Sequence, residues 1–191
     1  MSDLLHHVEI AAALGATVMR VCAGGRRTRS QNWPAQRNAL RPLLRAAAIF
    51  AADHEVTLAV ENHVDLLADE MIELLDAVDH PSLGVCLDTA NNLRMLEDPM
   101  RVIELLAPHA RATHIKDIAA YRGNPQTFAF WPSVPLGQGL IDIERTLQVL
   151  RKHNFTGLLA LEIDYLHPAY GDEEQAITAS LAYLRKLLAT D

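Results

Sequence analysis

Four short apolar runs of the chain each end in a titratable residue. The runs and their last residues are LAVE ending at Glu61, GVCLD at Asp88, ARATH at His114 and GLLALE at Glu162. Burying a carboxylate without a partner is unfavourable or forces its pKa upward. A chain that repeats this ending needs a common partner for the buried groups, and a bound metal ion is the simplest one.

Amphipathic patterns typical of helices separate these runs. We expect helices at 3–14, 35–54, 66–79, 99–107, 139–154 and 173–189, and strands at 17–22, 56–61, 83–88, 111–116 and 157–163. Such alternation predicts a parallel sheet with helices packed on it. Three of these strands begin near residues 56, 84 and 112, about 28 residues apart, which is close to the roughly 31 residues per unit of a TIM barrel.

The residues two positions before the strand ends are all small. They are Ala59, Cys86, Ala112 and Ala160, and they share a side of the sheet with the titratable groups because side chains alternate along a strand. Their neighbours on the other face, Val60, Leu87, Thr113 and Leu161, are mostly bulky or branched, as expected beneath helices. This pattern leaves room for a ligand at one mouth of a barrel.

Three carboxylates and one imidazole form an oxygen-rich donor set that suits Mn²⁺, Mg²⁺, Co²⁺ or Zn²⁺. Each residue alone has a structural alternative. Glu61 or Glu162 could cap a following helix, Asp88 could cap a turn that begins at Thr89, and His114 could pair with Asp117. Equivalent positions for all four residues favour one shared ion.

The motifs LAVENH, GVCLDTANN, THIKD, PLGQGLID and LALEID, in this order, resemble those of the xylose isomerase-like TIM barrels, which include sugar phosphate isomerases and epimerases. The resemblance covers nearly the whole chain. In ketose 3-epimerases of this superfamily, the matching residues bind one divalent metal ion and the two glutamates also move the proton. The resemblance therefore implies Glu61, Asp88, His114 and Glu162 as metal ligands, with Glu61 and Glu162 as catalytic residues.

Three further residues are candidate substrate contacts. His63 and Lys116 lie just beyond strand ends, where a solvated side chain is the alternative. Asn91 stands where the family often has histidine three positions after the strand-end aspartate, so an uncharged amide replaces a possible ligand or substrate contact. The related apurinic-site endonucleases use three zinc ions and need more histidines than these strand ends supply.

The resemblance also implies an incomplete barrel. Family members have eight strands, and the motifs place the five strands of this chain as strands 4–8 of an α/β barrel of TIM type. We therefore expect a single partial domain over residues 1–191. Truncation, completion by another chain and an open sheet remain alternatives, and the unpaired sheet edges favour a homo-oligomer.

Composition excludes several classes of protein. The 191 residues are 50% hydrophobic and 21% charged, which is ordinary for a globular domain with one core. Asp and Glu outnumber Lys and Arg by 24 to 17, which argues against a nucleic-acid partner. Neither a secretory leader nor a membrane span is evident, and two cysteines in apolar runs suit a reducing cytoplasm.

Other segments have structural interpretations. Cys86 has no obvious base to activate it as a nucleophile. GQG at 137–139 could direct amides at a phosphate, but a tight turn is the commoner use of such a pattern. The loop at 121–139, with Phe128, Phe130 and Trp131, suggests a lid or a hydrophobic anchor, and RRTR at 26–29 suggests a solvated loop.

Together these features predict a divalent-metal-dependent isomerase or epimerase of carbohydrate metabolism. Its substrate would be a small sugar or sugar phosphate, from which a glutamate removes the proton next to a carbonyl to give an enediolate. A dehydratase or other lyase on the same scaffold is the alternative. An inactive truncated fragment, or a binding module that retains metal affinity, is the alternative outside enzymes.

Overall fold

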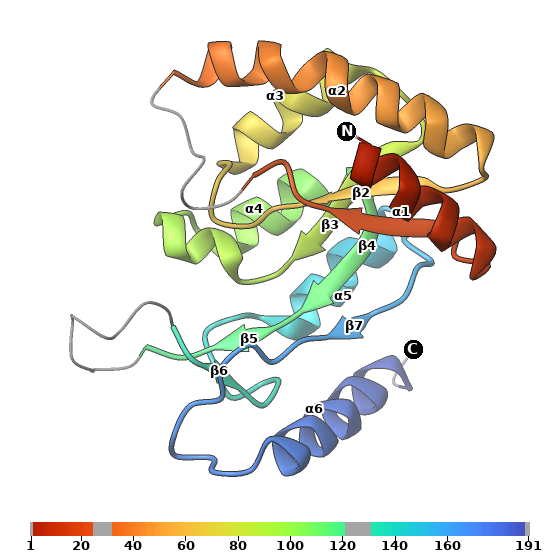
Figure 1. The fold of residues 1–191 in the computed structure, drawn as a ribbon. Coiled ribbons are helices and arrows are strands. Elements are labelled where there is room, and N and C mark those ends of the chain that lie inside the picture. The colour runs from red at the N-terminus through yellow and green to blue at the C-terminus, as the bar shows by residue number, and fades with distance from the viewer. Residues whose placement is uncertain (1, 25–31, 121–130, 190–191) are drawn as a thin grey trace.

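The computed structural model describes residues 2–24, 32–120 and 131–189, which form a curled parallel sheet surrounded by helices (Figure 1). The RRTR segment, Phe128, Phe130 and most of the predicted lid lie outside these residues. The five strands are adjacent in chain order: β1 (Val18–Val21), β2 (Thr57–Glu61), β3 (Leu83–Asp88), β4 (Ala110–Ile115) and β7 (Ala160–Leu161). Every neighbouring pair is parallel, so the predicted incomplete barrel is confirmed as a five-stranded half-barrel.

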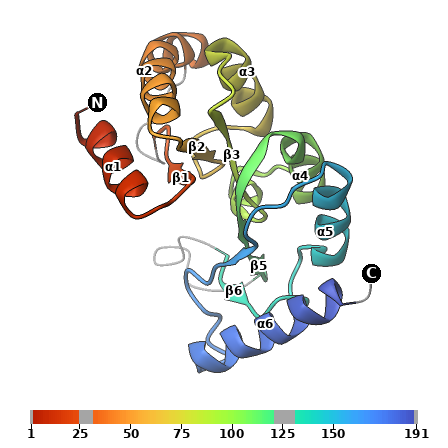
Figure 2. The same ribbon diagram turned by 90° about the vertical axis from the view of Figure 1, so that its right-hand side faces the viewer.

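The helices form an arc around the convex face of the sheet (Figure 2). They are α1 (Ser2–Ala13), α2 (Trp33–Asp53), α3 (Ala68–Val78), α4 (Pro99–Leu106), α5 (Ile143–Lys152) and α6 (Glu173–Leu188), with short 3-10 turns η1 (Asn91–Met95) and η2 (Ala107–His109). Successive helices from α1 to α5 contact each other. Within the described part of the chain, no helix combines the length and apolar character that a membrane span requires.

Polar caps set the starts of several helices. The side chains of Asp98 and Asp142 accept hydrogen bonds from the backbone N–H groups of Arg101 and Arg145 at 2.8 and 2.9 Å. A cap of this kind stabilises a helix by about 1 kcal/mol. Asp142 also corrects one prediction, because α5 begins after this cap rather than at residue 139.

The core lies between the convex face of the sheet and the helices. Val60 and Leu87 belong to it, as the alternation along the strands predicted. On the concave face, Cys86, Ala112 and Ala160 line a hollow of about 480 Å³ together with Arg20 and other residues. The small side chains therefore leave space inside the half-barrel, and this space reaches Arg20 and His114.

Two features of the sheet differ from the sequence-based expectation. The strand expected at 157–163 pairs only over β7, with His114 opposite Ala160 and Ile115 opposite Leu161. A second, antiparallel pair joins β5 (Asp117–Ile118) to β6 (Ser133–Val134). Pairs of two residues leave no periodic pattern in a sequence, so they cannot be predicted from alternation.

We expect the 191-residue chain to associate through the concave side of the sheet. Within the described residues, β1 pairs only with β2 and β7 only with β4, so both edges present free backbone groups. A specific interface would bury about 1,200 Å² or more in total. Light scattering at several protein concentrations should show a concentration-dependent increase in mass.

A charge inside the hollow should weaken this association. Leu158 lines the hollow and is 86% exposed, whereas the exposed Leu43 lies on α2 and is not a lining residue. Leu158→Glu should therefore lower the association constant at least about tenfold, as expected for a charge at an interface core, and Leu43→Glu should not. A monomer at every concentration with a cooperative melt would contradict the prediction.

Candidate functional site

The four titratable residues at the strand ends converge at the carboxyl edge of the sheet. Glu61 and Asp88 end β2 and β3, His114 is the fifth residue of β4, and Glu162 directly follows β7. One donor atom from each lies within 4.8 Å of the others. Parallel strands bring their carboxyl ends to one edge, which explains why residues up to about 100 positions apart in the sequence meet here.

Several of the converging atoms lack hydrogen-bond partners. Oδ2 of Asp88, Nδ1 of His114 and Oε2 of Glu162 are buried and make no hydrogen bond within the described structure. Nδ1 of His114 lies 3.1 Å from Oε2 of Glu162 and 3.3 Å from Oε1 of Glu61, but without hydrogen-bond geometry. Buried polar atoms that make no hydrogen bond are costly, and a divalent ion among them would satisfy all three. The donor set therefore fits a metal ion.

The two carboxylate oxygens of Asp88 have different surroundings. Oδ1 accepts hydrogen bonds from the backbone N–H groups of Ala90 and Asn91, each at 2.8 Å. Asp88 thus caps the turn that follows β3, as one interpretation of the sequence predicted, and Oδ2 still points into the cluster. Burial raises the pKa of Asp88, although the nearby Lys116 ammonium opposes the shift.

Arg20 and Asn91 hold the carboxylate of Glu61 from two sides. The Arg20 Nε donates to Oε2 at 2.6 Å, its Nη2 also contacts this oxygen, and the Asn91 side chain donates to Oε1 at 3.1 Å. Burial raises the pKa of Glu61, but His114 and Arg20 outweigh it and keep this pKa below its ordinary value. Arg20 was missed in the sequence, where its signal is a single charge inside the apolar run TVMRVC.

Lys116, a predicted substrate contact, is turned into the cluster. Its side chain is 1% exposed, and its Nζ lies 3.1 Å from Oδ2 of Asp88 and 3.0 Å from Oε2 of Glu162. Nζ also donates to Oδ2 of Asp164 at 2.7 Å. Burial lowers the pKa of Lys116, but these carboxylates outweigh burial and raise it. The ammonium is therefore charged and surrounded by acids.

The other two predicted substrate contacts are differently placed. Asn91 is buried and bridges the site, because it donates to Glu61 and accepts from Nη1 of Arg94 at 3.2 Å. Arg94 also donates to Asp164 at 3.2 Å. His63 is partly buried beyond the end of β2 and lies outside the four-residue cluster.

Asn62 fixes the spacing between two of the strand ends. Its side-chain oxygen accepts from the backbone N–H of Asp88, and its side-chain nitrogen donates to the backbone carbonyl of Asp88, both at 2.8 Å. The same nitrogen donates to Asn92 at 2.8 Å. Asn62 therefore prolongs the pairing of β2 with β3 by a side chain and positions Glu61 relative to Asp88.

Asp117 organises the PLGQG loop and does not pair with His114. Its buried carboxylate accepts four backbone N–H bonds of 2.8–3.0 Å, which come from Ile118, Gly137, Gly139 and Ile141. Burial raises the pKa of Asp117, and the four N–H groups oppose the shift. The backbone N–H groups of Gly137 and Gly139 thus donate to an internal carboxylate, and that of Gln138 donates to the Pro135 carbonyl, so the GQG segment is a tight turn rather than a phosphate site.

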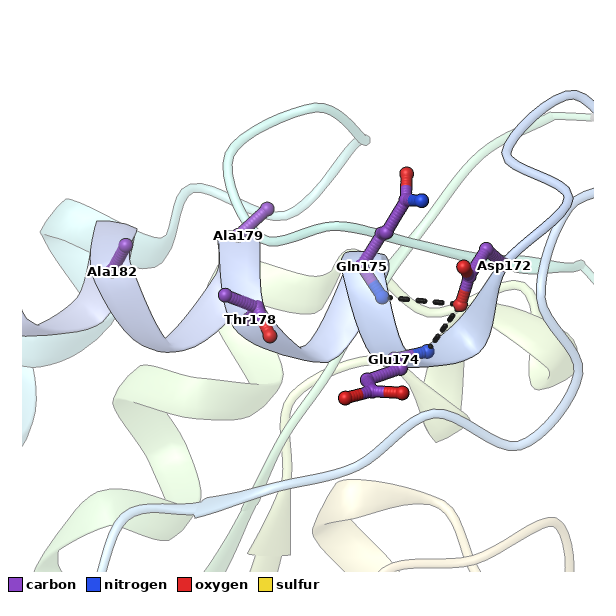
Figure 3. Close-up of a pocket in the computed structure, with 6 residues that line it drawn as sticks. All are labelled: Asp172, Glu174, Gln175, Thr178, Ala179 and Ala182. Carbon is purple, nitrogen blue, oxygen red and sulfur yellow. Dashed lines mark hydrogen bonds between the residues drawn. The ribbon is translucent and has the colours of Figure 1, made fainter.

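A separate hollow of about 480 Å³ lies on α6 (Figure 3). Asp172 caps this helix by accepting from the backbone N–H groups of Glu174 and Gln175 at 2.9 and 3.3 Å. Small side chains of Thr178, Ala179 and Ala182 form the rest of its surface. None of the strand-end residues lines this hollow, so it is not part of the candidate site.

The family profile described as xylose isomerase-like TIM barrel matches residues 1–187. Among curated proteins, the chain is similar to the 3-oxo-isoapionate decarboxylase of Pectobacterium atrosepticum, with 34% identity over 118 residues. That match covers 62% of this chain and 42% of the decarboxylase. The chain thus spans less than half the length of this relative.

Solved structures with the same fold match nearly the whole chain. The xylose isomerase domain protein of Planctomyces limnophilus has a TM-score of 0.79 at 21% identity, over 97% of this chain and 63% of that one. A xylose isomerase-like TIM barrel protein of Mycobacterium smegmatis, in complex with magnesium, has a TM-score of 0.75 at 20% identity. The match covers 98% of this chain and 66% of that one. An IOLI protein with a bound zinc atom has a TM-score of 0.78 at 17% identity, and the match covers 98% of this chain and 68% of that one. These likenesses show the fold.

Replacing Asp117 by asparagine should destabilise the protein. The amide keeps one acceptor oxygen, but its NH₂ group would face backbone N–H groups that now donate to a carboxylate. We expect the free energy of unfolding to fall by about 3 kcal/mol, measured by urea denaturation. Asp142→Asn is the matched control, because asparagine is an equally good helix cap and the change should stay within about 0.5 kcal/mol. Equal losses in both variants would contradict the role of Asp117.

Proposed function

Because the chain belongs to the xylose isomerase-like TIM barrel family, we propose that it is a divalent-metal-dependent isomerase or epimerase of a small sugar or sugar phosphate. The convergence of Glu61, Asp88, His114 and Glu162, with buried donor atoms left unsatisfied, carries this proposal. Matching structures include a D-tagatose 3-epimerase-like protein and a 3-keto-D-glucoside 4-epimerase, which supports the reaction class.

These four residues would hold the ion, which would be Mn²⁺, Mg²⁺, Co²⁺ or Zn²⁺. When bound, a divalent ion supplies positive charge that stabilises negative charge on the oxygens of a substrate. The remaining chemistry belongs to the side chains. Two carboxylates are available to move protons, Glu61 and Glu162, and their surroundings differ.

Glu162 is the better placed base. It is 28% exposed, and the nearby His114 and Lys116 outweigh burial and hold its pKa below the ordinary value, so that it is ionised and able to accept a proton. Glu61 is 2% exposed, and Arg20 and Asn91 occupy its oxygens. Glu162 would remove the proton next to the carbonyl and so become protonated. Glu61 would take up a proton from water and return it from the other face or to the adjacent carbon.

Substrate positioning falls to His63, Asn91 and Lys116 in this proposal. Lys116 places a buried positive charge beside the cluster, which would favour the negative charge that develops when a proton is removed. Asn91 would act mainly by orienting Glu61, since its amide is already hydrogen-bonded on both sides. His63 would contact the substrate from the end of β2.

A lyase is the second candidate, and the 34% likeness to a decarboxylase favours it. The same enediolate can expel a β-hydroxyl group. An enediolate also forms when CO₂ leaves from a hydroxyl-bearing carbon that is bonded to the carbonyl carbon, because the electron pair of the broken C–C bond passes to the carbonyl oxygen. The mass of the product distinguishes the reactions, because an isomer keeps the substrate mass while a lyase loses water or CO₂. A chain that binds metal without turnover would be a binding module.

The proposal implies a small carbohydrate as the ligand, a homo-oligomer as the assembly, and no nucleic acid or membrane as a partner. Both cysteines are free thiols: Cys86 is buried and Cys22 exposed. Free thiols are compatible with a reducing cytoplasm, which is the proposed location.

Divalent ions should stabilise the folded chain through His114. At a Mn²⁺ concentration of about 100 times Kd, binding adds about 2.7 kcal/mol, which corresponds to an increase in Tm of about 5–10 °C for a chain of this size. His114→Ala should lose most of this increase, whereas His153→Ala, at an exposed position after α5, should keep it. Differential scanning fluorimetry with Mn²⁺ and with a chelator measures the increase in Tm of each variant. An equal shift in the two variants would place the ion elsewhere.

Glu162→Gln should remove proton transfer while leaving ligand binding. The amide keeps an oxygen but cannot act as a base, so we expect solvent deuterium exchange at the carbon next to the carbonyl to fall by about 10²-fold or more. The measurement uses a panel of ketoses and keto-sugars in D₂O with Mn²⁺ and detects deuterium by mass spectrometry. Glu173→Gln in the first turn of α6 is the control. Unchanged exchange in Glu162→Gln would leave Glu61 or another group as the base.

A further inference from the structure

The Lys116 ammonium occupies an unusual place for a lysine. Its side chain is 1% exposed, and three carboxylates lie within 3.1 Å of Nζ: those of Asp88, Glu162 and Asp164. The backbone N–H of Lys116 donates to the Thr89 hydroxyl at 2.9 Å, and that hydroxyl donates to the Lys116 carbonyl. The residue is thus anchored between the ends of β3 and β4, and its charge is directed at the cluster.

Two of the three carboxylate oxygens are also donor atoms of the proposed metal site. Oδ2 of Asp88 and Oε2 of Glu162 lie 3.1 and 3.0 Å from Nζ, and both lack a hydrogen bond of good geometry. The third oxygen, on Asp164, lies outside the four-residue cluster and accepts a hydrogen bond of 2.7 Å. Lys116 therefore shares two donors with a divalent ion and has a partner of its own.

The ion pairs around the cluster show that Lys116 compensates the negative charge of Asp88 and Glu162. Arg20 pairs with Glu61, and Arg94 pairs with Asp164. Within the described part of the chain, Lys116 supplies the ammonium that lies next to Asp88 and Glu162, and the imidazole of His114 also lies beside both carboxylates. Like charges held a few ångströms apart in a buried site repel strongly, so two carboxylates without a metal ion need a cation beside them.

We propose that Lys116 is an internal counter-ion that competes with the divalent ion for Asp88 and Glu162. Without an ion, its ammonium keeps the carboxylates together. When an ion binds, the two like charges repel, and Lys116 keeps its hydrogen bond to Asp164, which Arg94 holds in place. The competition lowers the affinity of the site and makes loading reversible. This inference rests on the proposed function in taking the four residues as ligands.

Removing the charge of Lys116 should therefore tighten metal binding. We expect Lys116→Met and Lys116→Gln to bind Mn²⁺ about tenfold or more tightly than the parent chain at pH 8, because a nearby positive charge disfavours a second one. Isothermal titration calorimetry with MnCl₂ measures this without substrate. Lys152→Met, at the end of α5, is the control and should bind as the parent does. A purely structural lysine would leave affinity unchanged or lower it on removal.

The melting temperature provides a second measurement on the same proteins. Both variants should melt lower than the parent without metal, and Mn²⁺ should raise their Tm by more than it raises that of the parent. If the parent binds Mn²⁺ and the variants show neither tighter binding nor a larger Tm shift, the inference is overturned and the proposed function stands. Binding only by the variants supports the inference, and binding by none of the proteins overturns both.

Discussion

The mutual repulsion of three carboxylates at one edge of a parallel sheet is the constraint on which the site depends. Glu61 and Asp88 are 2% and 1% exposed, so water does not screen them, and the topology of the sheet forces them together with Glu162. Such a cluster is stable only if cations lie beside it. Arg20 on β1 and Lys116, the residue that follows β4, supply this charge, and His114 on β4 adds to it when it is protonated.

Neutral hydrogen bonds then fix where each oxygen points. Asn62 couples the backbone of Asp88 to the end of β2, Asn91 orients Glu61, and the turn after β3 takes one oxygen of Asp88. At Asp88, one oxygen is thereby held by the backbone and the other is left for the cluster, whereas both oxygens of Glu61 are held by side chains. This arrangement gives a preorganised donor set at the mouth of a hollow lined by small side chains, which is the requirement for binding an ion and a small ligand together.

Much of this architecture could be predicted from the sequence, since alternating apolar positions identify both the parallel sheet and the four strand-end residues. The cations could not be placed in the same way. Arg20 looks like a stray charge in a strand, and Lys116 looks like a solvated residue beyond a strand end, until the curvature of the sheet turns both inward. Asp117 shows the same limit, because its four N–H partners include residues up to 24 positions away that only the folded loop brings to it. Contacts that depend on a loop conformation leave no periodic signal.

The most direct test of the account is the position of a bound ion. Crystals of the chain grown with Mn²⁺ should show one strong anomalous-scattering peak among the side chains of Glu61, Asp88, His114 and Glu162, with bonds of about 2.0–2.3 Å to the oxygen and nitrogen donors. A peak at another place, or these four side chains ordered around no peak at saturating Mn²⁺, would contradict the account.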